Sequence, residues 1–278
     1  MDKLSPIVIE TFTKLMQTTI CNVTILQDGI SNINYLINGK YAMKVKTPSL
    51  DPFGHLQNDA RIQNLMADLG LSAPVLASDD ETGILISAYL ENTRYLSDQP
   101  TKKEFTLVAN TLQKLHQLPV DDVRLFDPIN RYLTYQRLGQ VPPLFPKLEA
   151  ELLEEFRLYF DNTPLRLCHN DVVRGNLLFQ GEKLLLIDYE YAGLNDPLFD
   201  HLSFLTENDI DSDENLKLYF SDVLQNHFPI TEDFLKRYIT LIDLLWYYWA
   251  EAYYQKTKKA IFAEIALSKK QRLCKRLT

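Results

Sequence analysis

The chain has 278 residues, a size near the point at which one hydrophobic core gives way to two, so we expect two lobes. A net charge of −8 argues against a nucleic-acid binder, which needs a basic surface to displace counterions from phosphates. No apolar run approaches the roughly 18 residues that span a bilayer, and the polar start of the sequence is unlike a secretory signal. We therefore expect a cytoplasmic protein with no nucleic-acid partner and no membrane insertion, while the sequence leaves the oligomeric state open.

Residues 1–90 predict a small lobe made mostly of β-strands. Ser5 and Pro6 are typical of a helix start, and this helix is expected to run to Met16. Asn38-Gly39 is typical of a hairpin turn between two strands. The patterns as a whole predict a helix over 53–69 and strands over 23–26, 34–37, 41–45, 74–77 and 84–88.

Residues 91–278 predict a larger, mainly helical lobe. Apolar residues recur with helical spacing over 101–118, 146–160, 196–206, 213–225, 231–255 and 260–276. Short apolar strands around a polar loop interrupt this pattern between residues 165 and 187. The proline-rich stretch 121–146 is irregular and predicts no element. A β lobe followed by a helical lobe with a short β insert makes an α+β fold.

The segment with the most chemical information lies in that β insert. It reads His169-x-Asp171 with Asn176 five residues after the aspartate, and Asp188 follows an apolar strand twelve residues later. Phosphoryl transfer needs an aligned hydroxyl and cations that neutralise phosphate oxygens. Asp171 can accept the hydroxyl proton, while Asn176 and Asp188 offer the hard oxygen ligands that suit Mg²⁺. Single aspartates are common turn residues, but the compound pattern favours a kinase, with His169 in a structural role.

These motifs resemble the choline kinase branch of the protein-kinase-like superfamily, which also holds ethanolamine kinases and aminoglycoside phosphotransferases. The resemblance covers about residues 27–265, most of the chain. It implies the two-lobed protein-kinase-like fold, with residues 1–90 as the nucleotide-binding lobe and 91–278 as the catalytic and acceptor-binding lobe. ATP and Mg²⁺ are the implied cofactors, and Asp171 is the implied catalytic base.

The resemblance also assigns the nucleotide contacts. Residues 28–35 are similar to the phosphate-covering turn of the family, with polar side chains in place of glycines, which agrees with only nine glycines in the chain. Lys44 resembles the strand lysine that touches the phosphates, and Asp59 stands where the glutamate partner of that lysine is normally found. The implied nucleotide contacts are Ser31, Asn32, Asn34, Lys44, Asp59, Ala88 and Leu90. The implied metal ligands are Asn176, Asp188 and Glu190.

An aromatic stripe in one predicted helix bears on the acceptor. Both tryptophans of the chain, Trp246 and Trp249, lie three residues apart, and with Tyr253 they share one helix face. A quaternary ammonium has no N–H to donate, so a protein holds it with aromatic faces and nearby negative charge. Taken alone, such a stripe is more often plain core packing.

The tryptophan pair resembles the one that lines the choline pocket of choline kinases. The resemblance adds Tyr191 as an aromatic wall, Glu207 as the carboxylate that faces the ammonium, and Phe262 as a ring from the last helix. Choline is therefore the favoured acceptor. Ethanolamine, thiamine or an aminoglycoside are the alternatives within the fold, and a catalytically inactive nucleotide-binding pseudokinase is the alternative from another class. Val173 stands where eukaryotic choline kinases carry glutamine; the bacterial type tolerates an apolar residue there.

Basic residues crowd the C-terminus of this acidic chain. We interpret them as the solvated side of an amphipathic last helix rather than as a patch for a membrane or a polyanion. They are Lys256, Lys258, Lys259, Lys269, Lys270, Arg272, Lys275 and Arg276.

Overall fold

The computed structural model describes residues 4–28, 32–46, 59–225 and 230–277. The chain forms two compact units: unit 1 is Met1–Leu96 with Gly175–Glu190, and unit 2 is Ser97–Arg174 with Tyr191–Thr278. The segment 175–190, grouped by the sequence pattern with the helical lobe, thus packs in unit 1. The reason is backbone pairing: Leu186 N–H donates to Leu71 O (2.9 Å), and Arg94 and Phe179 exchange two hydrogen bonds.

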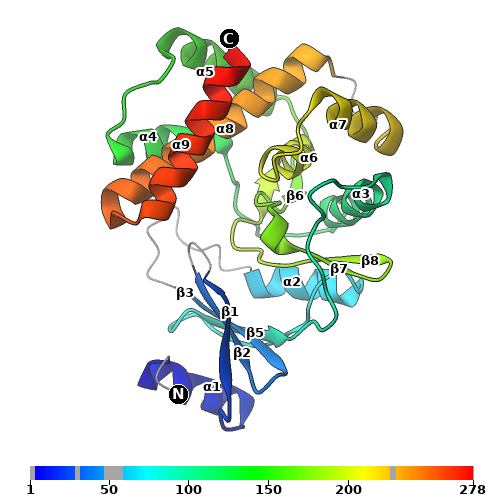
Figure 1. The fold of residues 1–278 in the computed structure, drawn as a ribbon, viewed down its shortest axis with the longest axis vertical. Coiled ribbons are helices and arrows are strands. Elements are labelled where there is room, and N and C mark those ends of the chain that lie inside the picture. Colours follow the sequence, from blue (N-terminus) through cyan, green and yellow to red (C-terminus); the bar gives the residue numbers. More distant parts are fainter. Residues whose placement is uncertain (1–3, 29–31, 47–58, 226–229, 278) are drawn as a thin grey trace. The chain divides into compact units, whose positions relative to one another are not determined.

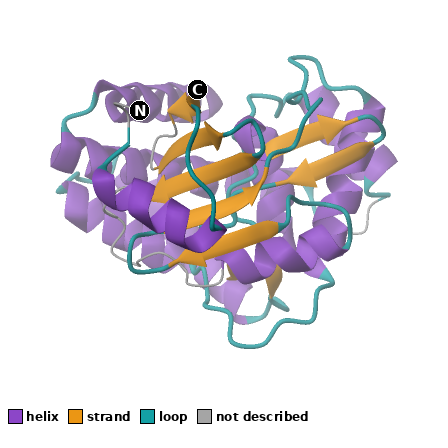
Figure 2. Ribbon diagram, turned by 90° about the horizontal axis from the view of Figure 1, so that it is seen from below, coloured by secondary structure: helices purple, strands orange, loops and turns teal. Residues whose placement is uncertain are grey.

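Unit 1 is built on a five-stranded antiparallel sheet with the order β1-β2-β3-β5-β4, whose strands lie side by side in Figures 1 and 2. Among its described residues, unit 1 also holds two helices and a separate two-stranded hairpin of β7 and β8. The elements are α1 (Pro6–Met16), β1 (Val23–Asp28), β2 (Asn32–Ile37), β3 (Tyr41–Lys46), α2 (Asp59–Asp68), β4 (Val75–Asp79), β5 (Ile84–Ala88), β7 (Leu177–Gln180) and β8 (Lys183–Leu186).

The core of unit 1 follows from the alternation of strand side chains. Tyr35 and Met43 stand directly opposite each other on β2 and β3, and both are buried together with Ile37 and Ile86. Phe12 of α1 packs into the same cluster. Burying one face of the sheet in this way fixes the register of the strands, because a slip by one residue would expose the whole apolar set.

The turn between β2 and β3 confirms the hairpin that Asn38-Gly39 predicts. Both residues have positive φ, 54° at Asn38 and 68° at Gly39, as the central residues of a type I′ turn require, and Lys40 N–H closes the turn on Ile37 O (3.1 Å). The Asn38 side chain also accepts hydrogen bonds from the N–H groups of Cys21 (2.8 Å) and Asn22 (3.1 Å). The turn is thereby tied to the chain that enters β1.

Unit 2 is mainly helical, with β6 and β9 paired antiparallel in a small sheet. The short turn η1 (Arg174–Asn176) stands where the two units meet in sequence. The other elements are α3 (Lys102–His116), α4 (Pro128–Gly139), α5 (Pro146–Asp161), β6 (Arg166–Cys168), β9 (Gly193–Asn195), α6 (Pro197–Thr206), α7 (Asp213–Lys217), the π-helical η2 (Leu218–Val223), α8 (Glu232–Thr257) and α9 (Ala260–Leu277).

Helix α8 is the centre of unit 2. Thr231 caps its start by accepting a hydrogen bond from Phe234 N–H (3.2 Å). From Tyr238 to Tyr253 nearly every residue is buried, as expected for a helix that is apolar on all sides. Helices α4 and α9 both pack on it, and α9 lies alongside it in Figure 1.

Helix α4 falls in the stretch for which the sequence pattern predicts no element. Its start does carry local signals: Asp127 accepts a hydrogen bond from Asn130 N–H (2.9 Å), and Pro128 is the first helical residue. The prolines elsewhere in the stretch obscured these signals. The α+β fold class is otherwise confirmed, and none of the described helices is long and apolar enough to cross a membrane.

Candidate active site

Lys44 on β3 is a buried lysine held by two carboxylates within unit 1. Its ammonium lies 2.6 Å from Asp59 Oδ2 and 2.8 Å from Asp188 Oδ1. Asp59 is the first residue of α2, and its other oxygen accepts a hydrogen bond from Tyr189 N–H (3.2 Å). The ion pair that the resemblance implies is therefore present, although aspartate is one methylene shorter than the usual glutamate.

Electrostatics keeps both members of this pair charged. Burial by itself lowers the pKa of Lys44, but the charges of Asp188 and Asp59 outweigh it and raise that pKa above its ordinary value. Burial likewise works to raise the pKa of Asp59, and Lys44, with a smaller effect of Lys46, lowers it overall. Unit 1 thus holds a fixed cation of the kind that contacts nucleotide phosphates in kinases.

We expect Asp59→Asn to destabilise the protein by about 1–3 kcal/mol at neutral pH, because it removes one partner of a buried cation. The folded state lowers the pKa of Asp59, so the carboxylate stabilises the protein above its unfolded pKa. This contribution is lost as the pH falls below the ordinary value of 3.8 towards the folded pKa. Denaturant unfolding at pH 7 and at pH 3 checks both statements. Asp68→Asn, an exposed aspartate on the same helix, is the control; an equal loss in both variants would contradict the pairing.

The three implied metal ligands lie in unit 1. Asn176 and the strand before Asp188 are joined through the backbone, because Ile187 N–H donates to Asn176 O (3.1 Å). Glu190 accepts a hydrogen bond from the Asn32 side chain at 2.7 Å, which links two of the predicted site residues. Asp188 has a φ of 66°, an uncommon value for a non-glycine residue that often marks functional positions. Two carboxylates and an amide form a hard oxygen set, so these residues fit Mg²⁺.

The remaining predicted nucleotide contacts are less closely tied to this group. Ser31 lies outside the described residues, whereas Asn34 stands on β2 opposite Lys44. Ala88 ends β5, and its N–H already donates to a backbone carbonyl before β4 (3.0 Å), so it is not available to adenine. Leu90 follows two residues later. Backbone contacts of this segment with adenine stay a prediction.

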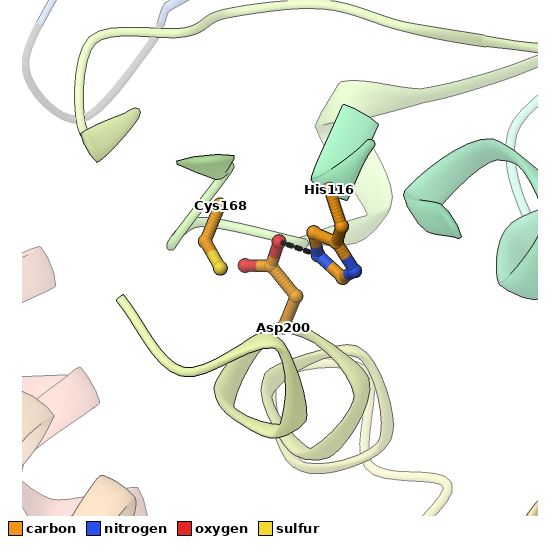
Figure 3. Close-up of side chains that lie close together, drawn as sticks. All are labelled: His116, Cys168 and Asp200. Atoms are coloured by element: carbon orange, nitrogen blue, oxygen red, sulfur yellow. Dashed lines mark hydrogen bonds and ion pairs between the residues drawn. The ribbon is translucent and has the colours of Figure 1, made fainter. Parts of the chain in front are cut away.

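In unit 2, the loop that carries Asp171 is anchored by the fully buried Asp200 of α6. Asp200 accepts hydrogen bonds from the N–H groups of His169 (2.8 Å) and Asn170 (2.7 Å). It also lies 2.9 Å from Nε2 of His116 on α3, as Figure 3 shows. Burial works to raise the pKa of Asp200, but His116 and the loop lower it overall. The backbone beside Asp171 is therefore fixed, and the buried His169 fits the structural role predicted for it.

One possible ligand atom from each of His116, Cys168 and Asp200 lies within 4.8 Å of the others, a spacing that a metal ion could use (Figure 3). Both Asp200 oxygens are already engaged in the hydrogen bonds of the loop. Burial raises the pKa of the Cys168 thiol well above its ordinary value, and the thiol donates to Asn195 O (3.5 Å). Since the thiolate is the form that binds metals, we interpret this group as a brace for the loop.

The predicted acceptor residues form a continuous aromatic cluster within unit 2. Trp246 contacts Tyr191 and Trp249 edge to face, with ring centres 5.8 Å and 5.9 Å apart. The ring centre of Trp249 in turn lies 4.8 Å from that of Tyr253 and 5.5 Å from that of Phe262. Both indole N–H groups are buried and have no hydrogen-bond partner within the described part of the chain. Buried tryptophan N–H groups usually find a partner, so water or a bound molecule is left to supply one for this pair.

Two cations near these residues were not assigned to the site from the sequence. Arg131 of α4 is buried, with its guanidinium carbon 4.4 Å from the Phe126 ring centre and 5.7 Å from that of Tyr191. It was missed because α4 itself was missed. Lys269 of α9 lies 2.7 Å from Glu207 Oε1, so the carboxylate expected to face an ammonium already pairs with a lysine.

The sequence profile of the Phosphotransferase enzyme family matches residues 22–233. The chain belongs to this family. The match includes Lys44, Asp171, Asn176 and Asp188, whose arrangement is described above. The chain is also 30% identical over 203 residues to the protein LicA of Haemophilus influenzae, across 68% of this chain and 75% of the relative.

Solved structures of other phosphotransferases share the fold. Choline kinase LicA from Streptococcus pneumoniae matches with a TM-score of 0.79 at 23% identity, over 98% of this chain and 97% of that one. The GDP and kanamycin complex of APH(2")-IIia matches with a TM-score of 0.67 at 16% identity, over 98% of each chain. This confirms the protein-kinase-like fold. Because a choline kinase and a kanamycin complex both have it, the acceptor has to be argued from side chains.

Proposed function

We propose that the protein is an ATP-dependent choline kinase that transfers the γ-phosphate of ATP to the hydroxyl group of choline. The choline oxygen bonds to the γ-phosphorus, the bond to the β-phosphate oxygen breaks, and ADP leaves. The reaction needs a proton acceptor, a cation at the phosphates and a site for the ammonium. Named residues of this chain can supply each of them.

The nucleotide half of the reaction is assigned to unit 1. Lys44, charged and fixed by Asp59, binds phosphate oxygens. Asn176, Asp188 and Glu190 would hold Mg²⁺, which neutralises charge on the phosphates when it is bound. The pseudokinase alternative rested on the aspartate at position 59, and the 2.6 Å ion pair between Lys44 and Asp59 removes that support.

The acceptor half is assigned to unit 2. Asp171 accepts the proton of the acceptor hydroxyl, and Asp200 holds the backbone that positions it. The observation that carries the choice of choline is the aromatic cluster around Trp246 and Trp249. Aromatic faces attract a trimethylammonium group, and the free energy needed to remove this cation from water is smaller than for a primary ammonium.

The other acceptors fit this cluster less well. Aminoglycosides carry several amines, which need several carboxylates, whereas Glu207 is already paired with Lys269. Ethanolamine is the closest competitor, since it shares the hydroxyl and the single positive charge of choline. Thiamine is also a cationic alcohol, but it is larger than choline and therefore needs more space among the rings.

We expect Trp249→Ala to raise the KM for choline by about tenfold or more and to leave the KM for ATP nearly unchanged. A good cation–π contact stabilises the complex by about 0.5–2 kcal/mol, and the substitution also removes a wall that excludes water. The preference for choline over ethanolamine is expected to narrow. Steady-state kinetics with both acceptors provide the measurement.

The matched control is Tyr247→Ala, a buried aromatic residue of the same helix whose ring contacts Tyr248 rather than the cluster. It removes similar core volume without touching the proposed ammonium site. If both variants changed the two KM values equally, the aromatic stripe would be ordinary core. The choice of choline would then lose its structural support.

A further inference from the structure

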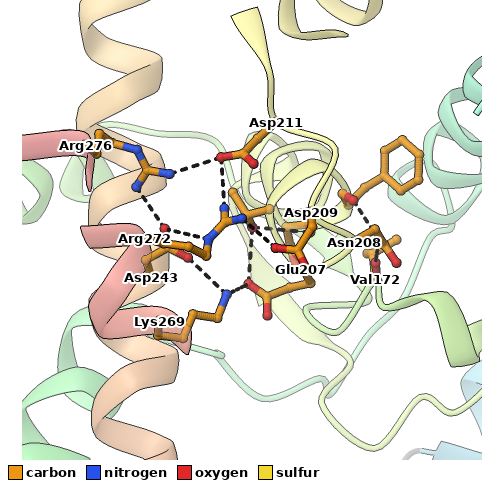
Figure 4. Close-up of polar contacts among 12 residues, drawn as sticks. Val172, Glu207, Asn208, Asp209, Asp211, Asp243, Lys269, Arg272 and Arg276 are labelled. Carbon is orange, nitrogen blue, oxygen red and sulfur yellow. Dashed lines mark hydrogen bonds and ion pairs between the residues drawn. The ribbon is translucent and has the colours of Figure 1, made fainter. Parts of the chain in front are cut away.

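Glu207 belongs to an ion-pair network that joins α6, α8 and α9 (Figure 4). Lys269 Nζ lies 2.7 Å from Glu207 Oε1 and 3.0 Å from Asp243 Oδ1. Arg272 and Arg276 bind the other oxygen of Asp243, at 3.4 Å and 2.8 Å. Lys269 is thus the residue of α9 that bonds directly to Glu207, while Asp243 keeps two further cationic partners.

Lys269 is buried more deeply than is usual for a lysine, with 6% of its surface exposed. Burial works to lower the pKa of Lys269, but Glu207 and Asp243 raise it overall, so the lysine is charged. Burial raises the pKa of Glu207; Lys269 and Arg272 oppose that rise, while Asp243 adds to it. A carboxylate and a lysine in contact, the lysine buried and the carboxylate largely so, leave little net charge at this position.

The network and the aromatic cluster are built on the same two helices. On α8, Trp246 follows Asp243 by one turn, and on α9, Lys269 follows Phe262 by two turns. The helices contact each other at both levels, through Asp243 with Lys269 and through Trp249 with Phe262. Helix α9 therefore supplies both a ring of the cluster and, two turns later, the cation that pairs with Glu207.

Resting on the choline kinase activity proposed above, we propose that Lys269 is a specificity-determining residue that neutralises Glu207, so that the aromatic rings select the acceptor cation. A primary ammonium gains most from a carboxylate that is free to accept its N–H groups. In this chain one oxygen of the Glu207 carboxylate, Oε1, already accepts hydrogen bonds from Lys269 (2.7 Å) and Thr206 (3.2 Å). A quaternary ammonium cannot donate such a bond, so the pairing costs it only the through-space attraction of the carboxylate. A primary ammonium loses that attraction and the hydrogen bonds as well, so the pairing favours choline over ethanolamine.

Three variants test this through kcat/KM for choline and for ethanolamine. Lys269→Met releases Glu207, and the ratio of the choline value to the ethanolamine value is expected to fall by about fivefold or more. Glu207→Gln removes one negative charge beside the proposed ammonium site and leaves the Lys269 cation with Asp243 as its partner, so both acceptors are expected to bind less well. The double variant removes both charges, and its kcat/KM for choline is expected to return to within about threefold of wild type.

Arg276→Gln is the matched control, because it removes a cation that binds Asp243 and Asp211 but not Glu207. It is expected to keep the wild-type ratio. Choline binding can also be followed by intrinsic fluorescence, since both tryptophans of the chain lie in the cluster. This signal reports on the acceptor site without turnover.

Several results would overturn the proposal. One is an unchanged ratio in Lys269→Met, and another is an equal shift in Arg276→Gln. If Lys269→Met does not fold, the comparison of Glu207→Gln with the double variant decides: equally weak choline use in both contradicts a neutralising pair. Failure of wild type to phosphorylate either amino-alcohol would instead refute the proposed function, so the two failures are distinguishable.

Discussion

Asp171→Asn is expected to lower kcat with choline by at least about a hundredfold while nucleotide binding is kept. A positioned general base contributes on this scale, and asparagine cannot accept the proton of the hydroxyl group. The loop should keep its shape, because Asp200 holds it through the backbone N–H groups of His169 and Asn170. The measurement is steady-state turnover together with equilibrium binding of ATP.

Asp161→Asn, an exposed aspartate at the end of α5, controls for the change of charge. Turnover of Asp171→Asn at the wild-type level would remove Asp171 from the chemistry. A parallel loss of ATP binding and turnover would show that the substitution acts through the structure and not through the proton.

Asp188→Ala is expected to abolish activity, and excess Mg²⁺ is not expected to restore it fully. The variant loses a proposed metal ligand and also the carboxylate 2.8 Å from Lys44. Lys44 then keeps its ion pair with Asp59 and the charge of Glu190, so the cation that binds phosphate is no longer paired with two aspartates.

A magnesium titration of turnover, read beside ATP affinity, measures this effect. Asp80→Ala, an exposed aspartate of unit 1, is the control and is expected to behave as wild type. Full recovery of Asp188→Ala at high Mg²⁺ would mean that Asp188 only raises metal affinity. A nucleotide complex in which Asp188 is remote from the ion would also contradict its assignment.

Much of the fold follows from local patterns. The α1 helix was predicted from Ser5-Pro6 with its end at Met16, and the β2–β3 hairpin from Asn38-Gly39. Where elements were missed or misplaced, the deciding contacts were distant in sequence. Residues 175–190 pack in unit 1 because Leu186 pairs with Leu71, more than a hundred residues earlier, and no local periodicity reports such a contact.

The charged residues of the last helix show the same limit of prediction from local sequence patterns. The basic C-terminal residues were predicted to form a solvated face. Lys256, Lys258, Lys259, Lys270 and Lys275 are exposed, but the prediction is wrong for Lys269, Arg272 and Arg276. Those three lie at helical spacing on one side of α9 and pair with carboxylates of other elements. Their i, i+3, i+7 spacing was visible in the sequence, whereas their acidic partners could be assigned only from the fold.

The candidate site was likewise predicted from the sequence only in part. The motif around Asp171 and Asp188 identifies phosphoryl transfer because the chemistry fixes both residue types and spacing. The ion pair of Lys44 with Asp59 could not be decided from the sequence, because one methylene changes the reach of a carboxylate. The fold settles it at 2.6 Å. Arg131 beside Tyr191 was outside any predicted element, so nothing in the sequence pattern pointed to it.

The central claim is tested most directly by turnover of the purified wild-type protein with Mg-ATP and a panel of alcohols. The panel holds choline, ethanolamine, thiamine and an aminoglycoside, each assayed for ADP release and for the phosphorylated product. We predict that choline has the highest kcat/KM, that ethanolamine is a weaker substrate, and that the aminoglycoside is not phosphorylated. Absence of phosphocholine, or a higher kcat/KM for another member of the panel, would contradict the assignment.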